Sequence, residues 1–221
     1  MYLQTKNTVT TPSNLLGLHY ILSRYAILLV LIRIYLTNSI FYGFMLWNLF
    51  LAYMPFFIGK IPITSKKILF LAFPVWLLFL PNAPYLVTDI FHLQQGNLMP
   101  MWFDLLLLLS FSINGLLLYF TSLKNFYKKV AFLYNQQIAT LLIYSSIILS
   151  SFGMYLGRYL RWNSWEIISQ PDALFNDVVN RVIHPLNHPR TWGITIGYSI
   201  LFGILFWYYK NLKISATFVK K

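Results

Sequence analysis

Asp89 and His92 are the side chains best suited to chemistry in this sequence, and they lie three residues apart, so on a helix they share one side. Asp104 follows at the start of the next apolar run. Carboxylates and imidazoles accept and donate protons in acid–base catalysis, and they also balance neighbouring charges. We therefore predict Asp89, His92 and Asp104 as candidate catalytic residues.

A basic and aromatic segment forms the second candidate group. Arg158 and Arg161 are three residues apart, which on a helix places them on one face, and Trp162 and Trp165 follow. Each planar guanidinium matches the shape of a carboxylate or a phosphate. The segment therefore predicts a site for an anionic envelope lipid or metabolite. Two alternatives remain: anchoring of these side chains among lipid head groups, and ion pairs with the carboxylates named above.

Asparagines in three separate apolar runs add hydrogen-bonding groups in the same half of the predicted helices. Asn48, Asn82 and Asn114 each need a partner and should face the interior of a bundle, either to form a polar recess or only to hold helices together. The predicted ligand-binding residues are Asn48, Asn82, Arg158, Arg161, Trp162, Asn163 and Trp165.

The string Pro81-Asn82-Ala83-Pro84 interrupts the third apolar run. Proline removes a backbone donor and clashes with the preceding turn. At about 1.5 Å per residue, Pro81 lies roughly 18–20 Å from the lysine-rich end of that run. A broken backbone at this depth is tolerated where protein buries it or where it lines a wet cavity. A simple kink, an outward-open recess and an unwound transport segment all fit the string.

Metal and cofactor chemistry has little support. His184 and His188 flank Pro185, which prevents the regular helical spacing of paired ligands, although with His92 and a carboxylate they would make up a ligand set. The chain has no cysteine, and it lacks glycine-rich dinucleotide and phosphate motifs. We predict no metal and no cofactor, and whether the protein is an enzyme stays open.

The composition indicates that the candidate residues belong to a membrane protein. Hydrophobic residues make up 58% of the 221 residues and charged residues only 10%, against about 25% charged residues in soluble domains. Six apolar runs are long enough to cross about 30 Å of hydrocarbon. We predict an all-α membrane protein, a six-span transmembrane helix bundle over residues 15–210, between a tail at 1–14 and a basic tail at 211–221. The predicted spans cover residues 16–36, 40–58, 68–87, 102–121, 138–157 and 192–209.

The distribution of charge predicts the orientation. With six spans, every lysine falls on one side of the membrane and every acidic residue on or beside the loops of the other side. Positive residues in short loops stay cytoplasmic, so we predict a multi-pass plasma membrane protein with both termini in the cytoplasm and membrane lipids as partners. The net charge of +12 forms no basic stripe, so we predict no nucleic-acid partner. The lysine groups are Lys6; Lys60, Lys66 and Lys67; Lys124, Lys128 and Lys129; Lys210, Lys213, Lys220 and Lys221; the acids are Asp89, Asp104, Glu166, Asp172 and Asp177.

The residues after Pro171 follow the pattern of a short amphipathic helix that ends before Pro185. It is too short to span a membrane, so it should lie on the outer surface as a lid or shelf. Glycine pairs at Gly153/Gly157 and Gly193/Gly197 have the spacing of close helix contacts. The apolar side of the predicted surface helix consists of Leu174, Phe175, Val178, Val179, Val182 and Ile183.

Four strings stand out together in this sequence. They are Trp47-Asn48-Leu49-Phe50-Leu51-Ala52, Leu80-Pro81-Asn82-Ala83-Pro84-Tyr85 with Thr88-Asp89, Trp102-Phe103-Asp104, and Gly157-Arg158 with Leu160-Arg161-Trp162-Asn163-Ser164-Trp165. Over roughly residues 40–205 the chain resembles a bacterial integral membrane family known only as domain of unknown function 1361. The resemblance implies an integral membrane protein of the bacterial cell envelope, and it carries over no catalytic role.

We predict that the outer half of the bundle holds a polar recess, built from spans two to five, that binds or processes an anionic envelope component. A small-solute transporter is the first alternative, although no second broken helix stands at a matching position. A non-catalytic scaffold or assembly protein is the second alternative, with the outer charges forming structural ion pairs alone. The oligomeric state stays open.

Overall fold

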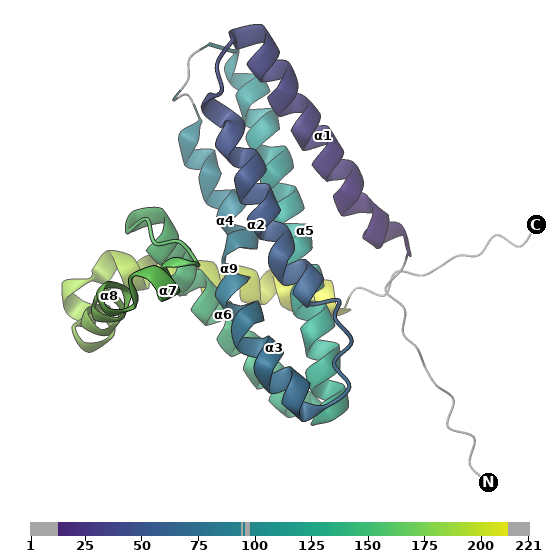
Figure 1. The fold of residues 1–221 in the computed structure, drawn as a ribbon, viewed down its shortest axis with the longest axis vertical. Helices are drawn as coiled ribbons and strands as arrows, with labels where there is room; N and C mark the ends of the chain where they lie inside the picture. The colour runs from purple at the N-terminus through teal and green to yellow at the C-terminus, as the bar shows by residue number, and fades with distance from the viewer. Residues whose placement is uncertain (1–12, 94, 96–97, 212–221) are drawn as a thin grey trace, which may run out of the picture.

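The computed structural model describes residues 13–93, 95 and 98–211, and this part of the chain is helical without a strand (Figure 1). The prediction of an all-α fold is confirmed. The elements are α1 (Ser13–Thr37), η1 (Phe41–Gly43), α2 (Phe44–Ile58), α3 (Lys66–Phe79), α4 (Asn82–Thr88), η2 (Asp89–His92), α5 (Met101–Leu133), α6 (Gln136–Tyr159), α7 (Glu166–Ser169), α8 (Pro171–Ile183), η3 (Pro185–Asn187) and α9 (Pro189–Asn211).

Six helical stretches in the described residues are long and apolar enough to cross a membrane, as predicted, and they indicate a multi-pass membrane protein. Two of them extend furthest beyond the predicted bounds, because the third continues past residue 87 to His92 and the fourth continues past residue 121 to Leu133. The stretches are Gly17–Thr37, Phe41–Ile58, Lys66–His92, Met101–Leu133, Gln136–Tyr159 and Pro189–Asn211.

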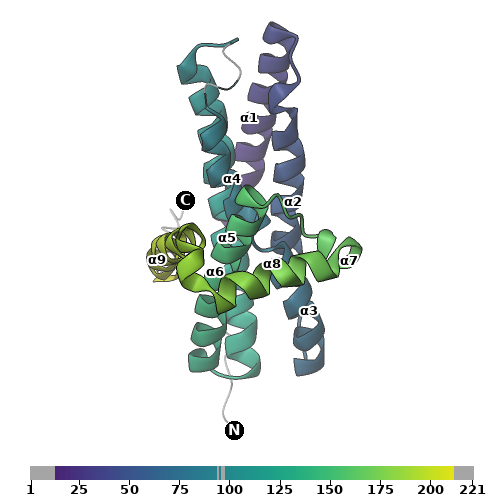
Figure 2. The same cartoon turned by 90° about the vertical axis from the view of Figure 1, so that its left-hand side faces the viewer.

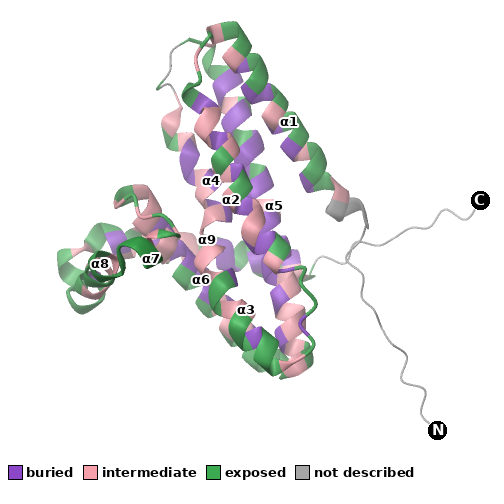
Figure 3. Cartoon of the chain, in the orientation of Figure 1, coloured by how far each residue is buried: buried purple, intermediate pink, exposed green. Residues whose placement is uncertain are grey.

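Helix α5 forms the centre of the bundle. In its most apolar window 67% of the residues are buried, against 22–44% in the other candidate spans, and Figure 3 shows buried residues along its length. Helices α1, α2 and α4 pack on α5, and α6 packs on its second half. Helix α1 runs antiparallel to α5, since Ser23 contacts Asn114 and the later Arg33 contacts the earlier Asp104. Helix α6 follows α5 after a two-residue connection and returns along it, with Tyr119 bonded to Ser150.

Helix α9 departs from a simple up-and-down bundle. Trp192 near its start stacks on Phe152, and Tyr209 near its end shares a hydrogen bond of 2.8 Å with Thr121. Phe152 and Thr121 lie at similar heights of the antiparallel α5–α6 pair, because Tyr119 faces Ser150 across that pair. Helix α9 therefore crosses α5 and α6 steeply, as the views of Figures 1 and 2 agree.

The lysines of the described residues gather near the C-terminal end of α5. The Lys129 ammonium donates to the carbonyl oxygens of Gly59 (2.6 Å) and Ile61 (2.5 Å), and the Lys66 ammonium lies 4.5 Å from the Tyr134 ring centre. Asp104 lies at the opposite end of α5. Lysines and intramembrane acids are thus separated along the bundle, while the cytoplasmic location of the lysine end stays a prediction. Lys6, Lys213, Lys220 and Lys221 lie outside the described residues.

The proline string divides the third span into α3 and α4, with Pro81 immediately before α4. Three glycines let α4 approach its neighbours. A Cβ atom on Gly115 would lie 2.4 Å from the Ala83 carbonyl oxygen, and one on Gly153 would lie 2.6 Å from Pro81 Cγ. Gly157 packs similarly against the Tyr85 ring. The prediction that Gly153 and Gly157 mark a close helix contact is confirmed, whereas Gly193 and Gly197 have open space around them.

Candidate functional site

A cavity of about 470 Å³ lies between α2, the α3–α4 break, α6, α8 and α9. Most of its lining is apolar, and asparagine, serine and tryptophan side chains interrupt that lining. Figure 2 shows α7 and α8 running across the bundle in front of α6, and α8 contributes residues to the lining. The lining residues are Trp47, Asn48, Leu51, Leu77, Leu78, Pro81, Asn82, Tyr85, Ile148, Leu149, Phe152, Gly153, Leu156, Gly157, Trp162, Asn163, Ser164, Leu174, Val178, Val182, Trp192 and Thr195.

The broken helix supplies part of the polar lining. Asn82 begins α4, and its Nδ2 donates to the Phe79 carbonyl oxygen at 3.0 Å and to Ser164 Oγ at 3.1 Å. Ser164 in turn donates to the Leu78 carbonyl oxygen at 3.3 Å. The α3–α4 break and the loop after α6 are therefore joined at the cavity. Three interpretations of the proline string were open: a simple kink, a recess and an unwound transport segment. This geometry fits a break in the helix that lines a recess.

The predicted amphipathic helix is α8, and it begins at Pro171 as expected. Leu174, Val178 and Val182 line the cavity. The Trp162 indole donates to the Asp177 carboxylate at 2.8 Å, and this bond ties α8 to the loop after α6. Helix α8 is thus one wall of the cavity, in agreement with the expectation of a lid or shelf.

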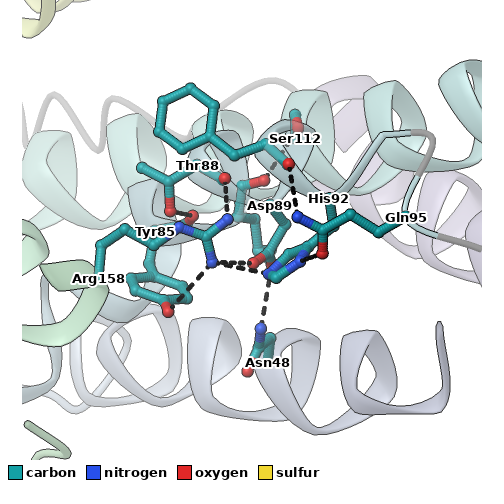
Figure 4. A network of polar contacts seen from close by, with 10 residues as sticks. Asn48, Tyr85, Thr88, Asp89, His92, Gln95, Ser112 and Arg158 are labelled. Carbon is teal, nitrogen blue, oxygen red and sulfur yellow. Dashed lines mark hydrogen bonds and ion pairs between the residues drawn. The ribbon is translucent and has the colours of Figure 1, made fainter. Parts of the chain in front are cut away.

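Arg158 forms the centre of a buried polar network next to the cavity (Figure 4). Its guanidinium lies 3.3 Å from the Asp89 carboxylate and donates to the Thr88 carbonyl oxygen. The same group contacts His92 Nε2 at 3.0 Å and the Tyr85 hydroxyl at 3.5 Å. Asp89 is fully buried, and its second oxygen accepts a hydrogen bond from Asn48 Nδ2 at 3.0 Å. The alternative prediction of an ion pair between this arginine segment and Asp89 is confirmed.

His92 is held on both ring nitrogens. Its Nδ1 lies 2.6 Å from Gln95 Oε1 and its Nε2 faces Arg158. Because the Arg158 guanidinium can only donate, Nε2 is the acceptor and Nδ1 carries the proton. The imidazole therefore acts here as a connector, and Figure 4 shows it between Gln95 and Arg158.

Asp104 lies apart from this network. Its carboxylate forms a bidentate pair with Arg33 of α1, at 2.7 Å and 3.1 Å, and both side chains are buried. The Tyr42 ring covers the Arg33 guanidinium at 4.2 Å, and the Tyr42 hydroxyl donates to the His92 carbonyl oxygen. The structure therefore does not bring Asp104 together with Asp89 and His92 as one catalytic group.

Arg161 also differs from the prediction. Helix α6 ends at Tyr159, and Arg161 has a left-handed φ of 63°, so Arg158 and Arg161 do not share a helical face. The turn lets the Trp162 amide reach back to the Leu156 carbonyl oxygen at 3.2 Å. The Arg161 side chain is exposed and is absent from the cavity lining.

The other predicted ligand residues divide between the cavity and its surroundings. Asn163 lines the cavity, and its Nδ2 donates to Glu166 at 3.2 Å. Trp165 lies outside the lining and packs against Trp47 with ring centres 6.3 Å apart. Asn114 faces α1, where it donates to Ser23 at 2.6 Å, so it joins helices away from the cavity.

The remaining histidines lie outside the Arg158 network. His184 and His188 flank η3, where His184 is exposed and His188 is half-buried. Within the described ranges no three His, Cys, Asp or Glu side chains come close enough to hold a metal ion.

Sequence reasoning did not single out Ser164, Thr195 or Tyr85 as lining residues, nor the pairing of Arg33. Tyr85 and Ser164 each belong to one of the four strings that carry the family resemblance, and this was the signal in the sequence that could have identified them. Arg33 carried a signal too, because an arginine inside an apolar run needs a buried partner.

A family model described as "Protein of unknown function (DUF1361)" matches residues 47–205. The matched range contains every cavity-lining residue and the Asp89–Arg158 pair, whereas Arg33 precedes it. No curated protein and no solved structure matched the chain.

Proposed function

We propose that this chain, which belongs to the family described as protein of unknown function (DUF1361), binds a membrane amphiphile whose hydrocarbon portion occupies the cavity beside α6. The proposal narrows the sequence-based expectation of an envelope ligand to one that carries a long apolar part. It assigns no reaction, because both ring nitrogens of His92 and the Asp89 carboxylate are engaged inside the protein.

The observation that carries the proposal is the apolar rim of the cavity. Trp47, Leu149 and Val182 line the cavity and are also exposed. Trp47 and Leu149 belong to candidate membrane spans, so we expect the surface around them to face lipid. An opening bordered by such side chains connects the cavity with the hydrocarbon of the bilayer.

Helix α8 supports the same opening. Beside its cavity-facing row, Phe175 and Ile183 form an exposed apolar edge, and the far side carries exposed Asp172, Asn176 and Asn180. A helix with this division lies at the boundary of lipid and water, with its apolar edge in the acyl region. The cavity wall and the lipid-facing edge of α8 are thus continuous.

Filling the opening tests the proposal. In Leu149→Trp the larger ring would occupy the rim, so we expect loss of an amphiphile that copurifies with the wild-type protein. Leu141 lies on the same helix, outside the lining, and is comparably exposed (68%, against 52% for Leu149), so Leu141→Trp is the matched control. Native mass spectrometry of the full chain in mild detergent measures the bound mass. Equal retention by both variants, or no copurifying amphiphile with the wild type, would contradict the proposal.

A scaffold role is the second candidate, and one observation favours it. The intramembrane carboxylates Asp89 and Asp104 are each paired with an arginine of another helix, as expected for charges that hold a bundle together. The Leu149→Trp experiment separates the two candidates, because a scaffold would retain no specific lipid. Transport and an anionic ligand stay predictions, and an anionic group would depend on the exposed Arg161.

A further inference from the structure

Polar atoms of the cavity lining that lack a hydrogen-bond partner indicate which head group the cavity can bind. Asn48, Asn82 and Asn163 line the cavity, and in each case Nδ2 already donates to an acceptor of the chain, namely Asp89, the Phe79 carbonyl and Glu166. Carboxylates and backbone carbonyls only accept hydrogen bonds, so the orientation of all three carboxamides is fixed. Their Oδ1 atoms receive no hydrogen bond from any described residue. Each of these three lining residues therefore keeps an acceptor oxygen that a ligand could use.

Thr195 supplies an independent indication of a ligand. Its side chain is 1% exposed and lines the cavity, and its hydroxyl has no hydrogen-bond partner within the described part of the chain. A buried hydroxyl without a partner is unfavourable. Ligand groups that both donate and accept hydrogen bonds suit Thr195 and the asparagine oxygens alike.

Among the described residues, no lysine, arginine or histidine lines this space. Arg158 is compensated by Asp89, and its Nη atoms are occupied by Asp89, His92, Tyr85 and the Thr88 carbonyl. The Trp162 indole is bound to Asp177. A phosphate in the cavity would meet carbonyl oxygens and lack a countercharge, which is costly in a low-dielectric site.

From these contacts we infer that the amphiphile carries an uncharged, hydroxyl-bearing head group, of the glycerol or glycosyl kind, and not a phosphate. Ligand hydroxyl groups can donate hydrogen bonds to the carboxamide oxygens. They can also donate to the Thr195 hydroxyl or accept a hydrogen bond from it. The inference rests on the proposed function. The arginines of the sequence predicted an anionic ligand, whereas the asparagine oxygens that lack donors favour an uncharged one.

Two lipids that differ only in a phosphate make the test. The full chain is purified in a detergent without hydroxyl groups and titrated with a monoacylglycerol or with the lysophosphatidic acid of the same brominated acyl chain. Quenching of tryptophan fluorescence reports binding, since Trp47, Trp162 and Trp192 line the cavity. We expect the monoacylglycerol to bind at least about tenfold more tightly, as for a site that loses matched hydrogen bonds. An alkyl glucoside of matched chain length then separates a glycosyl from a glycerol head.

Variants of the rim sharpen the comparison. Asn163→Lys places a cation at the rim and should reverse the preference toward the lysophosphatidic acid, while Asn176→Lys, on the water-facing side of α8, should leave the preference unchanged. Thr195→Val keeps the shape of the side chain and removes its hydroxyl, so it should weaken monoacylglycerol binding several-fold.

The two proposals fail differently. Equal or tighter binding of the lysophosphatidic acid to the wild type, with saturable quenching by both lipids, would overturn the head-group inference and leave amphiphile binding intact. Absence of saturable quenching with every lipid would overturn the proposed function itself.

Discussion

Two ion pairs with buried carboxylates join different helices in the described part of the chain. Arg33 and Asp104 join α1 to α5, and Arg158 and Asp89 join α6 to the end of α4. Tyr42 links the two pairs, because it covers Arg33 and donates to the His92 carbonyl oxygen. In a medium without water, each of these charges depends on its own partner.

Removing one partner of a pair should therefore lower the free energy of unfolding more than removing both partners. We expect Asp104→Asn to lower the free energy of unfolding by about 3–5 kcal/mol, because it leaves the Arg33 guanidinium buried without its carboxylate. The double variant Arg33→Met with Asp104→Leu should recover most of that loss. Thermal unfolding in detergent measures both, and Arg24→Met, an exposed position of the same helix, serves as control. Equal destabilisation by the single and double variants would show that the pair is not the unit of stability.

At this scale the sequence predicts residue types better than partners. Asp89, Asn48, Asn82 and Arg158 were identified by type and depth, and the structure brings them to one region. Asp104 was grouped with them because the sequence predicts it on the same side of the membrane, but that does not fix the direction in which a side chain points around a bundle. Its rotation on α5 directs it to α1.

The break between α3 and α4 sets the position of the cavity, and it depends on close backbone contacts. Pro81 ends the regular helix, and Gly115 and Gly153 leave room for the displaced α4 against α5 and α6. Proline interrupts the helix, while glycine provides the space, and neither residue type alone would produce this packing.

Gly115→Ala should separate α4 from α5. The added Cβ would meet the Ala83 carbonyl oxygen at 2.4 Å, and the backbone cannot move aside without shifting the helix. We expect a loss of about 1–3 kcal/mol of stability, typical of overpacking, seen as a lower unfolding temperature. Gly197→Ala meets nothing within 4 Å and should lie within about 0.5 kcal/mol of the wild type. An unchanged unfolding temperature for Gly115→Ala would argue against the close α4–α5 contact.

Elements were the most predictable level of this fold. Apolar length located the six spans, and the change of period after Pro171 located α8. The end of α6 was harder to predict from the sequence. Arg161 takes a left-handed conformation that glycine usually adopts at helix ends, and the sequence has no glycine there. That single turn removes Arg161 from the face of Arg158.

Among the described residues, the lysines and the intramembrane carboxylates lie toward opposite ends of α5. Lysines surround the end of α5 near Leu133, and Asp104 with its partner lies at the other end, with the Asp89 network on the same side. The crossing of α9 over α5 and α6 was not foreseeable, because the crossing angle depends on how Trp192, Phe202 and Tyr209 fit the ridges of two helices.

The orientation of this charge gradient decides which compartment supplies the cavity. If lysine loops stay in the cytoplasm, the η2–α5 connection faces outward and the α2–α3 connection faces inward. The chain has no cysteine, so a single introduced thiol reports its own location. Gln95 and Thr64 are both exposed and lie in these two connections. A membrane-impermeant maleimide applied to intact cells should label Gln95→Cys and should label Thr64→Cys only after permeabilisation. The reverse pattern would place the Asp89 end in the cytoplasm, and the cavity would then receive its amphiphile from the inner leaflet.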